Sequence, residues 1–240
     1  MHAHATLTAQ AAGDGRTVLT ATRSQPPLTL RRVRAPGPGA EVCLVGSAAG
    51  PLGGDHLELA VTVGGGAALR LRSTSAQLVQ PGRDGDPATT HTRASVEGHL
   101  AVALEPTVLV RGAVLHAATT LDLAPAASTH WQETTVLGRH GEVPGRARQH
   151  WRVTRGGRPL LCTTTSLLAE ADYRSPALLG RASVLSTVLV VAPGLRPVAR
   201  TRPGGAVHLL AEDAALVSVL AKDTVHAAHA VAELTEGWLP

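Results

Sequence analysis

Apolar and polar residues alternate with a period of two through most of the chain. Residues 56–63 (HLELAVTV) are the clearest case, because every second residue is Leu or Val. Glycines 64–66 follow, and in residues 68–73 the apolar positions alternate with arginines. The pattern predicts two strands joined at a glycine corner, each with one apolar face. Such a unit cannot bury that face alone, so we expect further units of the same kind to pack against it.

Turn residues interrupt the rest of the chain at short intervals. We expect a short strand or an ordered tail in residues 1–16 and a loop in residues 80–90. The other predicted strands are 17–22, 28–33, 41–45, 99–104, 107–110, 114–123, 130–137, 149–154, 160–168, 183–191 and 206–210. This spacing indicates a mainly β protein, either a sandwich or a stacked, helical (β-helix-like) arrangement of β-sheets. No strict repeat appears, so a solenoid with a regular sequence code is not supported.

The period changes only near the C-terminus. Apolar residues from 212 to about 233 lie at mostly helical spacing, and two acidic residues at its beginning favour a helix start. We expect one or two helices, broken near residues 223–224, in a small helical part at about 211–236. The sequence thus indicates a single domain over residues 1–240, with its β portion at about 17–210. The apolar helix face suits a helical partner, and its residues are Leu216, Leu220, Val231 and Leu234.

The composition narrows the kind of core and partner. The 240 residues are 44% hydrophobic but include no Phe and only 2% aromatic residues, so the core must consist of Leu, Val and Ala. The net charge is +4, and Lys222 is the only lysine among the basic residues. The scattered arginines and the lack of aromatic stacking groups argue against a nucleic-acid partner. The excess positive charge favours an acidic partner instead.

The compartment follows from the cysteines and the N-terminus. Cys43 and Cys162 lie far apart in apolar strands, which is typical of reduced thiols in a cytoplasmic protein. The first residues lack a signal peptide, and the longest apolar run, 183–193, is too short to cross a bilayer. We therefore expect a cytoplasmic protein with no membrane span.

No familiar catalytic motif is present, and the histidines do not predict a tight metal cage. The chain lacks G-x-S-x-G, a Walker loop, H-E-x-x-H and C-x-x-C. His2 and His4 lie on an expected mobile terminus, and His226 and His229 on a predicted helix. Two imidazoles make only a weak site for Ni²⁺ or Zn²⁺. The sequence predicts neither an enzyme nor a tightly bound cofactor.

Three acidic residues are candidates for a functional site. Asp55 follows two glycines, where its carboxylate can cap the turn or face an interior passage and bind a cation. Glu133 lies among apolar residues, and Glu142 lies between Arg139 and Arg146. Surface ion pairing and a functional role remain open for both glutamates.

Three segments carry a family pattern. Residues 50–79 (GPLGGDHLELAVTVGGGAALRLRSTSAQLV) combine a Gly-Gly-Asp turn, an alternating strand, a glycine corner and a Ser/Thr-rich strand. Residues 98–113 (GHLAVALEPTVLVRGA) contain a Pro-x-Thr strand, and residues 133–153 (ETTVLGRHGEVPGRARQHWRV) contain E-x-x-x-x-G-R and then Gly-Glu. In this order, over about residues 27–191, they resemble the urease accessory protein family UreD, also called UreH. The chain departs from that family's charged or aromatic residues at Leu78, Gln80, Val102 and Val110.

The resemblance implies a mainly β, helix-like stack of sheets that catalyses no reaction of its own. Members of the family bind the accessory protein UreF, through it the GTPase UreG, and then apo-urease. The assembly delivers nickel to urease, and an internal nickel passage has been proposed for the family. Asp55, Glu133 and Glu142 fit such a passage, because carboxylates bind Ni²⁺ weakly enough for transient contact.

Two alternatives remain. One is a carbohydrate-active enzyme on a β-solenoid with Asp55 and Glu133 as its acid pair, although aromatic residues to stack on sugars are scarce. The other is a β-rich adaptor without a metal role, which differs only in whether Asp55→Ala, with folding and partner binding intact, lowers the nickel content of urease.

Overall fold

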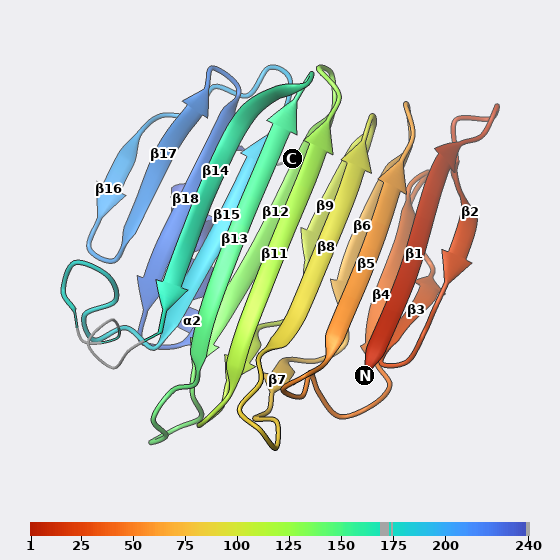
Figure 1. Cartoon of the computed structure of the whole chain (residues 1–240). Coiled ribbons are helices and arrows are strands. Elements are labelled where there is room, and N and C mark those ends of the chain that lie inside the picture. The colour runs from red at the N-terminus through yellow and green to blue at the C-terminus, as the bar shows by residue number, and fades with distance from the viewer. Residues whose placement is uncertain (169–172, 174, 239–240) are drawn as a thin grey trace.

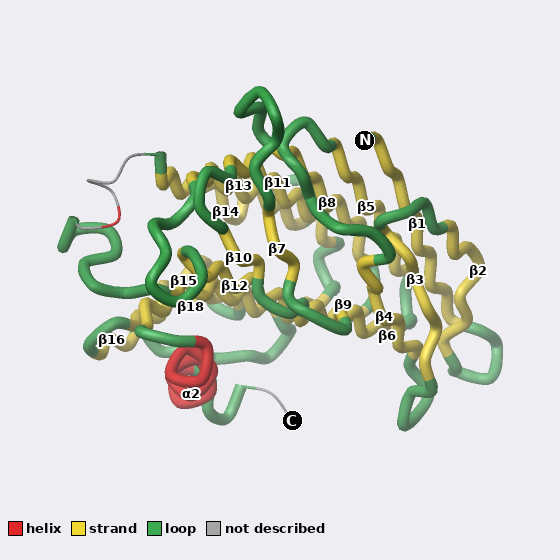
Figure 2. The backbone as a smooth tube through the Cα atoms, turned by 90° about the horizontal axis from the view of Figure 1, so that it is seen from below, coloured by secondary structure: helices red, strands yellow, loops and turns green. Residues whose placement is uncertain are grey.

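The computed structural model describes residues 1–168, 173 and 175–238. Two β-sheets lie face to face in it (Figure 1). In spatial order, sheet A consists of β14 (Arg158–Leu167), β13 (Arg146–Arg155), β11 (Val114–Leu123), β8 (Ala88–Val96), β5 (His56–Val63), β1 (His2–Ala11) and β2 (Thr17–Arg23). Sheet B consists of β16 (Arg200–Arg202), β17 (Gly205–Ala211), β18 (Ala214–Ala221), β15 (Val184–Val191), β12 (Ser128–Leu137), β9 (His99–Ala103), β6 (Ala68–Ser73), β4 (Ala40–Gly46) and β3 (Leu28–Val33). The short strands β7 (Gln77–Val79) and β10 (Thr107–Leu109) continue sheet B from β12 and lie between the layers in Figure 2.

The central part is a β-solenoid in which the chain alternates between the sheets. It runs from β5 to β6, through β7 back to β8, on to β9, through β10 to β11, and then to β12 and β13. Neighbouring strands of successive turns are parallel and in register, so that Leu59, Thr92, Thr119 and Trp151 lie at one height in sheet A. This confirms the mainly β, helix-like stack of sheets that the sequence predicts.

Antiparallel strands close the stack at both ends. At one end β1 pairs with β2 and β3 with β4; at the other, β13 pairs with β14, and β15, β18, β17 and β16 form an antiparallel run. A solenoid of parallel strands needs such atypical end units, because its last turn has no further turn to cover it.

Apolar side chains fill the space between the sheets, and a second core lies outside sheet B. Leu, Val and Ala residues dominate the inter-sheet core, with the buried Trp131 as its largest side chain. Helix α2 (Thr224–Leu234) covers the outer face of β15, β17 and β18, where Val231 and Leu234 pack against a Val-rich surface (Figure 2). No helix in the described part of the chain is long and apolar enough to cross a membrane.

Three expectations about single elements are wrong. His2 and His4 do not lie on a mobile terminus, because residues 1–16 contain strand β1 of sheet A, which confirms the strand alternative for this segment. The predicted loop at 80–90 overlaps β8, which begins at Ala88. The predicted helix from 212 is wrong at its start, because residues 214–221 form β18 and the helix begins only at Thr224.

The error at β18 has a physical cause. Val217 and Val219 face helix α2, whereas Leu216 and Leu220 pack against the cores between the sheets. A strand that is covered on both faces loses its polar alternation, so its sequence cannot be distinguished from a buried helix by period alone.

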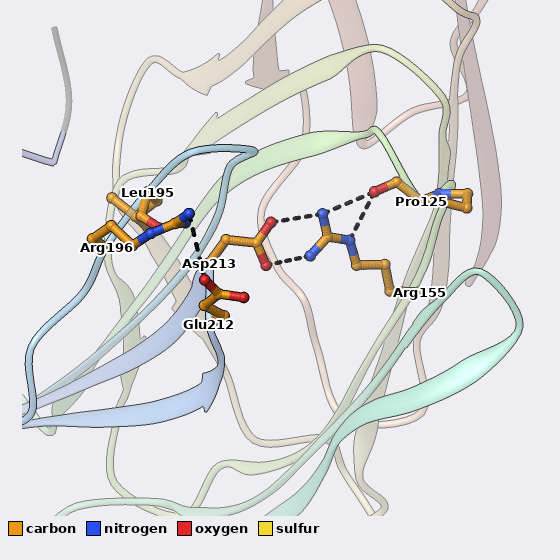
Figure 3. A network of polar contacts seen from close by, with 6 residues as sticks. All are labelled: Pro125, Arg155, Leu195, Arg196, Glu212 and Asp213. Atoms are coloured by element: carbon orange, nitrogen blue, oxygen red, sulfur yellow. Dashed lines mark hydrogen bonds and ion pairs between the residues drawn. The ribbon is translucent and has the colours of Figure 1, made fainter.

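An ion pair joins the two sheets at the edge of the molecule where β13 ends and β18 begins (Figure 3). Arg155, the last residue of β13 in sheet A, donates from its two terminal nitrogens to the two carboxylate oxygens of Asp213, at 2.6 and 2.9 Å. Its Nε and one terminal nitrogen also donate to the carbonyl oxygen of Pro125, at 3.0 and 2.8 Å. Asp213 lies just before β18 of sheet B, so the guanidinium connects the sheets and the corner between β11 and β12.

We expect Asp213→Asn to lower the free energy of unfolding by about 1–3 kcal/mol at pH 7, because it leaves a largely buried guanidinium partly unpaired. The hydrogen bonds from Arg155 lower the pKa of Asp213. A lowered pKa means that the pair stabilises the fold above about pH 4 and loses this contribution as the pH falls further. The difference between the wild type and the variant in urea unfolding should therefore shrink below about pH 4. Glu212→Gln is the control, since the Glu212 carboxylate is 81% exposed; an equal loss in both variants would contradict the role of the pair.

The corner between β8 and β9 requires a glycine. A Cβ on Gly98 would clash with the carbonyl oxygen of Ala67 and lie 2.6 Å from that of Gly64 in the corner of the preceding turn. Both atoms belong to backbone that is held by stacked hydrogen bonds, including His99 N to Ala67 O at 2.8 Å. We expect Gly98→Ala to cost about 2–3 kcal/mol in thermal or urea unfolding. Gly46→Ala, where a Cβ meets no atom within 4 Å, should be nearly neutral; comparable losses would refute close stacking of the corners.

Candidate functional site

Glu133 on β12 points into the space between the sheets and is held by three uncharged donors. Its Oε1 accepts hydrogen bonds from Thr119 Oγ1 on β11 at 2.6 Å and from Trp131 Nε1 at 3.0 Å. Its Oε2 accepts one from Trp151 Nε1 on β13 at 3.0 Å. The alternation of β12 explains the direction, because Glu133 follows the inward-facing Trp131 by two residues. A carboxylate thus occupies a position that an apolar side chain fills elsewhere in the core.

The surroundings of Glu133 favour its neutral form or a positive partner. Burial raises the pKa of the Glu133 carboxyl, and the hydrogen bonds from Thr119, Trp131 and Trp151 oppose that rise. Protein surrounds the Glu133 side chain on all sides. It is nevertheless only half-buried, because part of its surface lines internal cavities. Since its three donors are uncharged, a cation entering this space would compensate a charge that the protein itself leaves uncompensated.

Glu133 lies where two inter-sheet cavities meet. A cavity of about 110 Å³ reaches it from the side of β8 and β11, and a small one of about 20 Å³ continues toward β14 and β15. Hydroxyl and amide groups line both cavities next to the carboxylate. These polar residues are Thr90, Thr92, Thr119, Thr135, Gln149, Thr163, Thr165 and Thr187.

The larger inter-sheet cavity adjoins a third cavity of about 350 Å³ at the lower edge of the molecule. The two share six lining residues, which are Leu28, Leu44, Gln77, Leu104, Glu105 and Thr107. Glu105 is exposed, so one carboxylate lies where the cavities meet the surface and Glu133 lies in the interior. Three neighbouring cavities with oxygen groups along them thus lie between the surface at Glu105 and the interior carboxylate of Glu133.

Asp55 has a different position. One carboxylate oxygen accepts a hydrogen bond from Leu52 N at 2.8 Å, and the other pairs with the Met1 amino group at 2.8 Å. The residue is 3% exposed, and it lines neither of the cavities that meet at Glu133. This arrangement is the turn cap that is one of the two alternatives considered for Asp55.

Glu142 lies in the loop after β12 and is bound by its own neighbour. Its carboxylate accepts hydrogen bonds from the backbone nitrogen, Nε and a terminal nitrogen of Arg139, each at 3.0 Å. These bonds lower the pKa of Glu142 to about 2. It borders a separate, open surface hollow next to Arg111 and His140. Of the two alternatives for Glu142, the geometry is that of a surface ion pair.

The three predicted acids therefore do not form one site. Among the described residues, no group of three or more His, Cys, Asp or Glu side chains is arranged to hold a metal ion. One cavity is lined by both Glu133 and Glu105, and no pattern in the sequence singled out Glu105. The signal for the interior site was present as inward-facing polar residues, such as Thr119 and Gln149, in strands whose inward positions are otherwise apolar.

The four expected partner-binding residues do not share a helix face. Leu216 and Leu220 lie on β18 and face the inter-sheet cores, whereas Val231 and Leu234 lie on α2 and face the opposite side of sheet B. Val231 and Leu234 are buried within this chain. Their role in partner binding stays a prediction.

Of the positions where the chain departs from the family pattern, two line the cavity of about 350 Å³. They are Leu78 and Gln80, and a change at either position alters the lining of this cavity. Val102 and Val110 are buried core residues, and substitution there changes packing.

Comparison with known proteins assigns the chain to a family. The family model of the UreD urease accessory protein matches residues 1–240. The urease accessory protein UreD of Streptomyces coelicolor is 36% identical over 236 residues, which cover 94% of this chain and 92% of that protein. That of Streptomyces avermitilis is 37% identical over 231 residues, covering 92% of each. UreD 1 of Saccharopolyspora erythraea is 40% identical over 201 residues, covering 80% of this chain and 77% of that protein. The chain therefore belongs to the UreD urease accessory protein family.

Proposed function

We propose that this protein is a non-enzymatic scaffold of urease maturation that passes Ni²⁺ toward apo-urease, in a cytoplasmic complex with UreF and the GTPase UreG. Family membership supports the urease maturation role. The nickel route rests on one observation above all: Glu133 lies where polar inter-sheet cavities meet, with no charged donor among its hydrogen-bond partners.

The chemistry of the route suits a passing ion rather than a bound one. Carboxylate and hydroxyl oxygens hold Ni²⁺ less firmly than clusters of imidazole and thiolate ligands. Glu105 at the entrance and Glu133 in the interior offer single carboxylates, so neither position can hold the ion as a resident cofactor. Of the three acids first considered, Glu133 carries the proposal, whereas the contacts of Asp55 and Glu142 support structural roles.

Neither alternative gains support from the geometry. A carbohydrate-active site would need Asp55 and Glu133 on one cleft, but Asp55 lines neither cavity at Glu133 and is bound within its own turn. An adaptor without a metal role would not require a carboxylate in the core. Substitution of Glu133 distinguishes the nickel scaffold from the adaptor. Substitution of the buried Asp55 would not, because it would disturb the turn that Asp55 caps.

The maturation role is tested by deleting this gene alone from a host that carries the urease operon. We expect urease to accumulate without nickel, since the scaffold that brings apo-urease and the metal together is missing. Urease activity and nickel content per purified urease are the readouts, and pull-down with the cognate UreF tests the complex. Unchanged activity and nickel content would contradict the proposed function.

The nickel route is tested by Glu133→Gln, which keeps the size of the side chain and removes its charge. We expect the nickel content of urease at limiting nickel to fall by about tenfold, which corresponds to about 1.4 kcal/mol of lost cation stabilisation. Glu105→Gln at the entrance should lower it in the same direction without affecting the core. Glu236→Gln, on the exposed surface after α2, is the matched control.

Folding and UreF binding of each variant are checked by circular dichroism and pull-down. If Glu133→Gln and Glu105→Gln fold, bind UreF and load urease like the wild type, the route through these cavities is wrong, although the scaffold role stands.

A further inference from the structure

The outer face of sheet A is uncovered and carries half of the histidines of the chain. Helix α2 packs on sheet B, and no helix among the described residues covers the outer side of sheet A (Figure 2). Strands β1, β5, β8, β11 and β13 present outward-facing imidazoles there, which we call the histidine face. Its histidines are His2, His4, His56, His91, His116 and His150.

The register of the solenoid sets these histidines in two neighbouring rows. His2, His56 and His116 lie at one height, with Thr89 between the last two. His4, His91 and His150 lie at the next outward height, together with Glu58. The rings of His2 and His56 stack with their centroids 4.7 Å apart and an angle of 8° between the ring planes. The register thus gathers imidazoles from different turns of the solenoid on one part of the outer face.

Arginines make the same face positive even when its histidines are neutral. The charged residues of the outward positions are Arg23, Arg93, Arg146, Arg148, Arg152, Glu58 and Asp122. Five arginines minus two carboxylates give a charge of +3, and each histidine that gains a proton adds one more. Both carboxylates have partners on the face, Glu58 with Arg93 and Asp122 with Thr154. The remaining charges are available to a partner.

Other ligand classes fit this surface less well. A metal site is disfavoured because no group of three or more suitable side chains among the described residues is arranged to hold an ion. Stacking of nucleic-acid bases is disfavoured because the outward positions of the face carry no Phe, Tyr or Trp. A flat sheet with dispersed positive charge suits a macromolecular surface of opposite sign.

We propose that the histidine face docks an acidic surface of a protein partner, and that this binding tightens as the pH falls through the range in which histidines gain protons. The inference is independent of the nickel route, which lies on the inner side of sheet A. Burial and the neighbouring Arg93 lower the pKa of His91. His56 and His116 are exposed and are the residues to test.

The test uses the full-length protein and labelled poly-L-glutamate as the acidic probe, with affinity measured by fluorescence anisotropy at about pH 8 and about pH 6. We expect the affinity to rise by about tenfold between these values at an ionic strength of about 0.15 M, because about three protonated histidines in contact with the probe would contribute about twofold each. The double variant with His56→Gln and His116→Gln should reduce this pH-dependent rise in affinity by about fourfold and leave the affinity at the higher pH unchanged. Arg148→Gln/Arg152→Gln should weaken binding by about fourfold at both pH values.

The matched control is His208→Gln/His229→Gln, which removes two exposed histidines on β17 and α2, away from this face. It should bind like the wild type. A full pH-dependent rise in His56→Gln/His116→Gln, or an equal loss in the control, would overturn the proposal. Tighter binding of a duplex DNA with the same dependence on the variants would also overturn it and assign the face to nucleic acid. Circular dichroism of each variant at both pH values ensures that folded proteins are compared.

Discussion

In-register stacking of parallel strands is the constraint on which the rest of the structure depends. Each turn of the solenoid contributes one strand to sheet A and one to sheet B, and the register keeps side chains of equal height next to one another. The corners keep this register only if the backbones of neighbouring turns touch, as at Gly98. Because the chain has no Phe, the narrow space between the sheets is filled by Leu, Val and Ala, whose packing depends on that close approach.

The same register explains why the interior is polar in one part only. The inward-facing row of sheet A at the height of Val61 continues along the stack with Ala94, Leu121 and Val153, and the core there is apolar. One step lower, Leu59 is followed by Thr92, Thr119, Trp151 and Thr163 along the stack. A row that changes from apolar to polar leaves hydroxyl groups facing Glu133 from the other sheet. The cavities follow from this row. Thr119 and Trp151, which belong to it, donate hydrogen bonds that stabilise the Glu133 carboxylate.

The sequence predicted many strands of the solenoid. Alternation located β3, β5 and β11 within a residue, since each has one face toward the core and one toward solvent or a sheet edge. It missed β8, whose inward positions mix Ala and Thr, and β18, which is covered on both faces. At the site, Glu133 was predicted, but its connection to Glu105 depends on which residues the fold brings to one cavity, and spacing along the chain does not reveal this.

Sheet A separates two kinds of chemistry because its side chains alternate. Inward positions of β11 and β13 supply Thr119 and Trp151 to the interior carboxylate, and the adjacent outward positions carry Thr120, His150 and Arg152. A shift of one residue in the register of either strand would exchange these faces, burying charge and exposing the donors of Glu133. The fold therefore cannot change its outer surface by slippage without losing the polar cavities around Glu133. Substitutions at outward positions alone leave the register intact, so the outer surface can vary while the cavities stay the same.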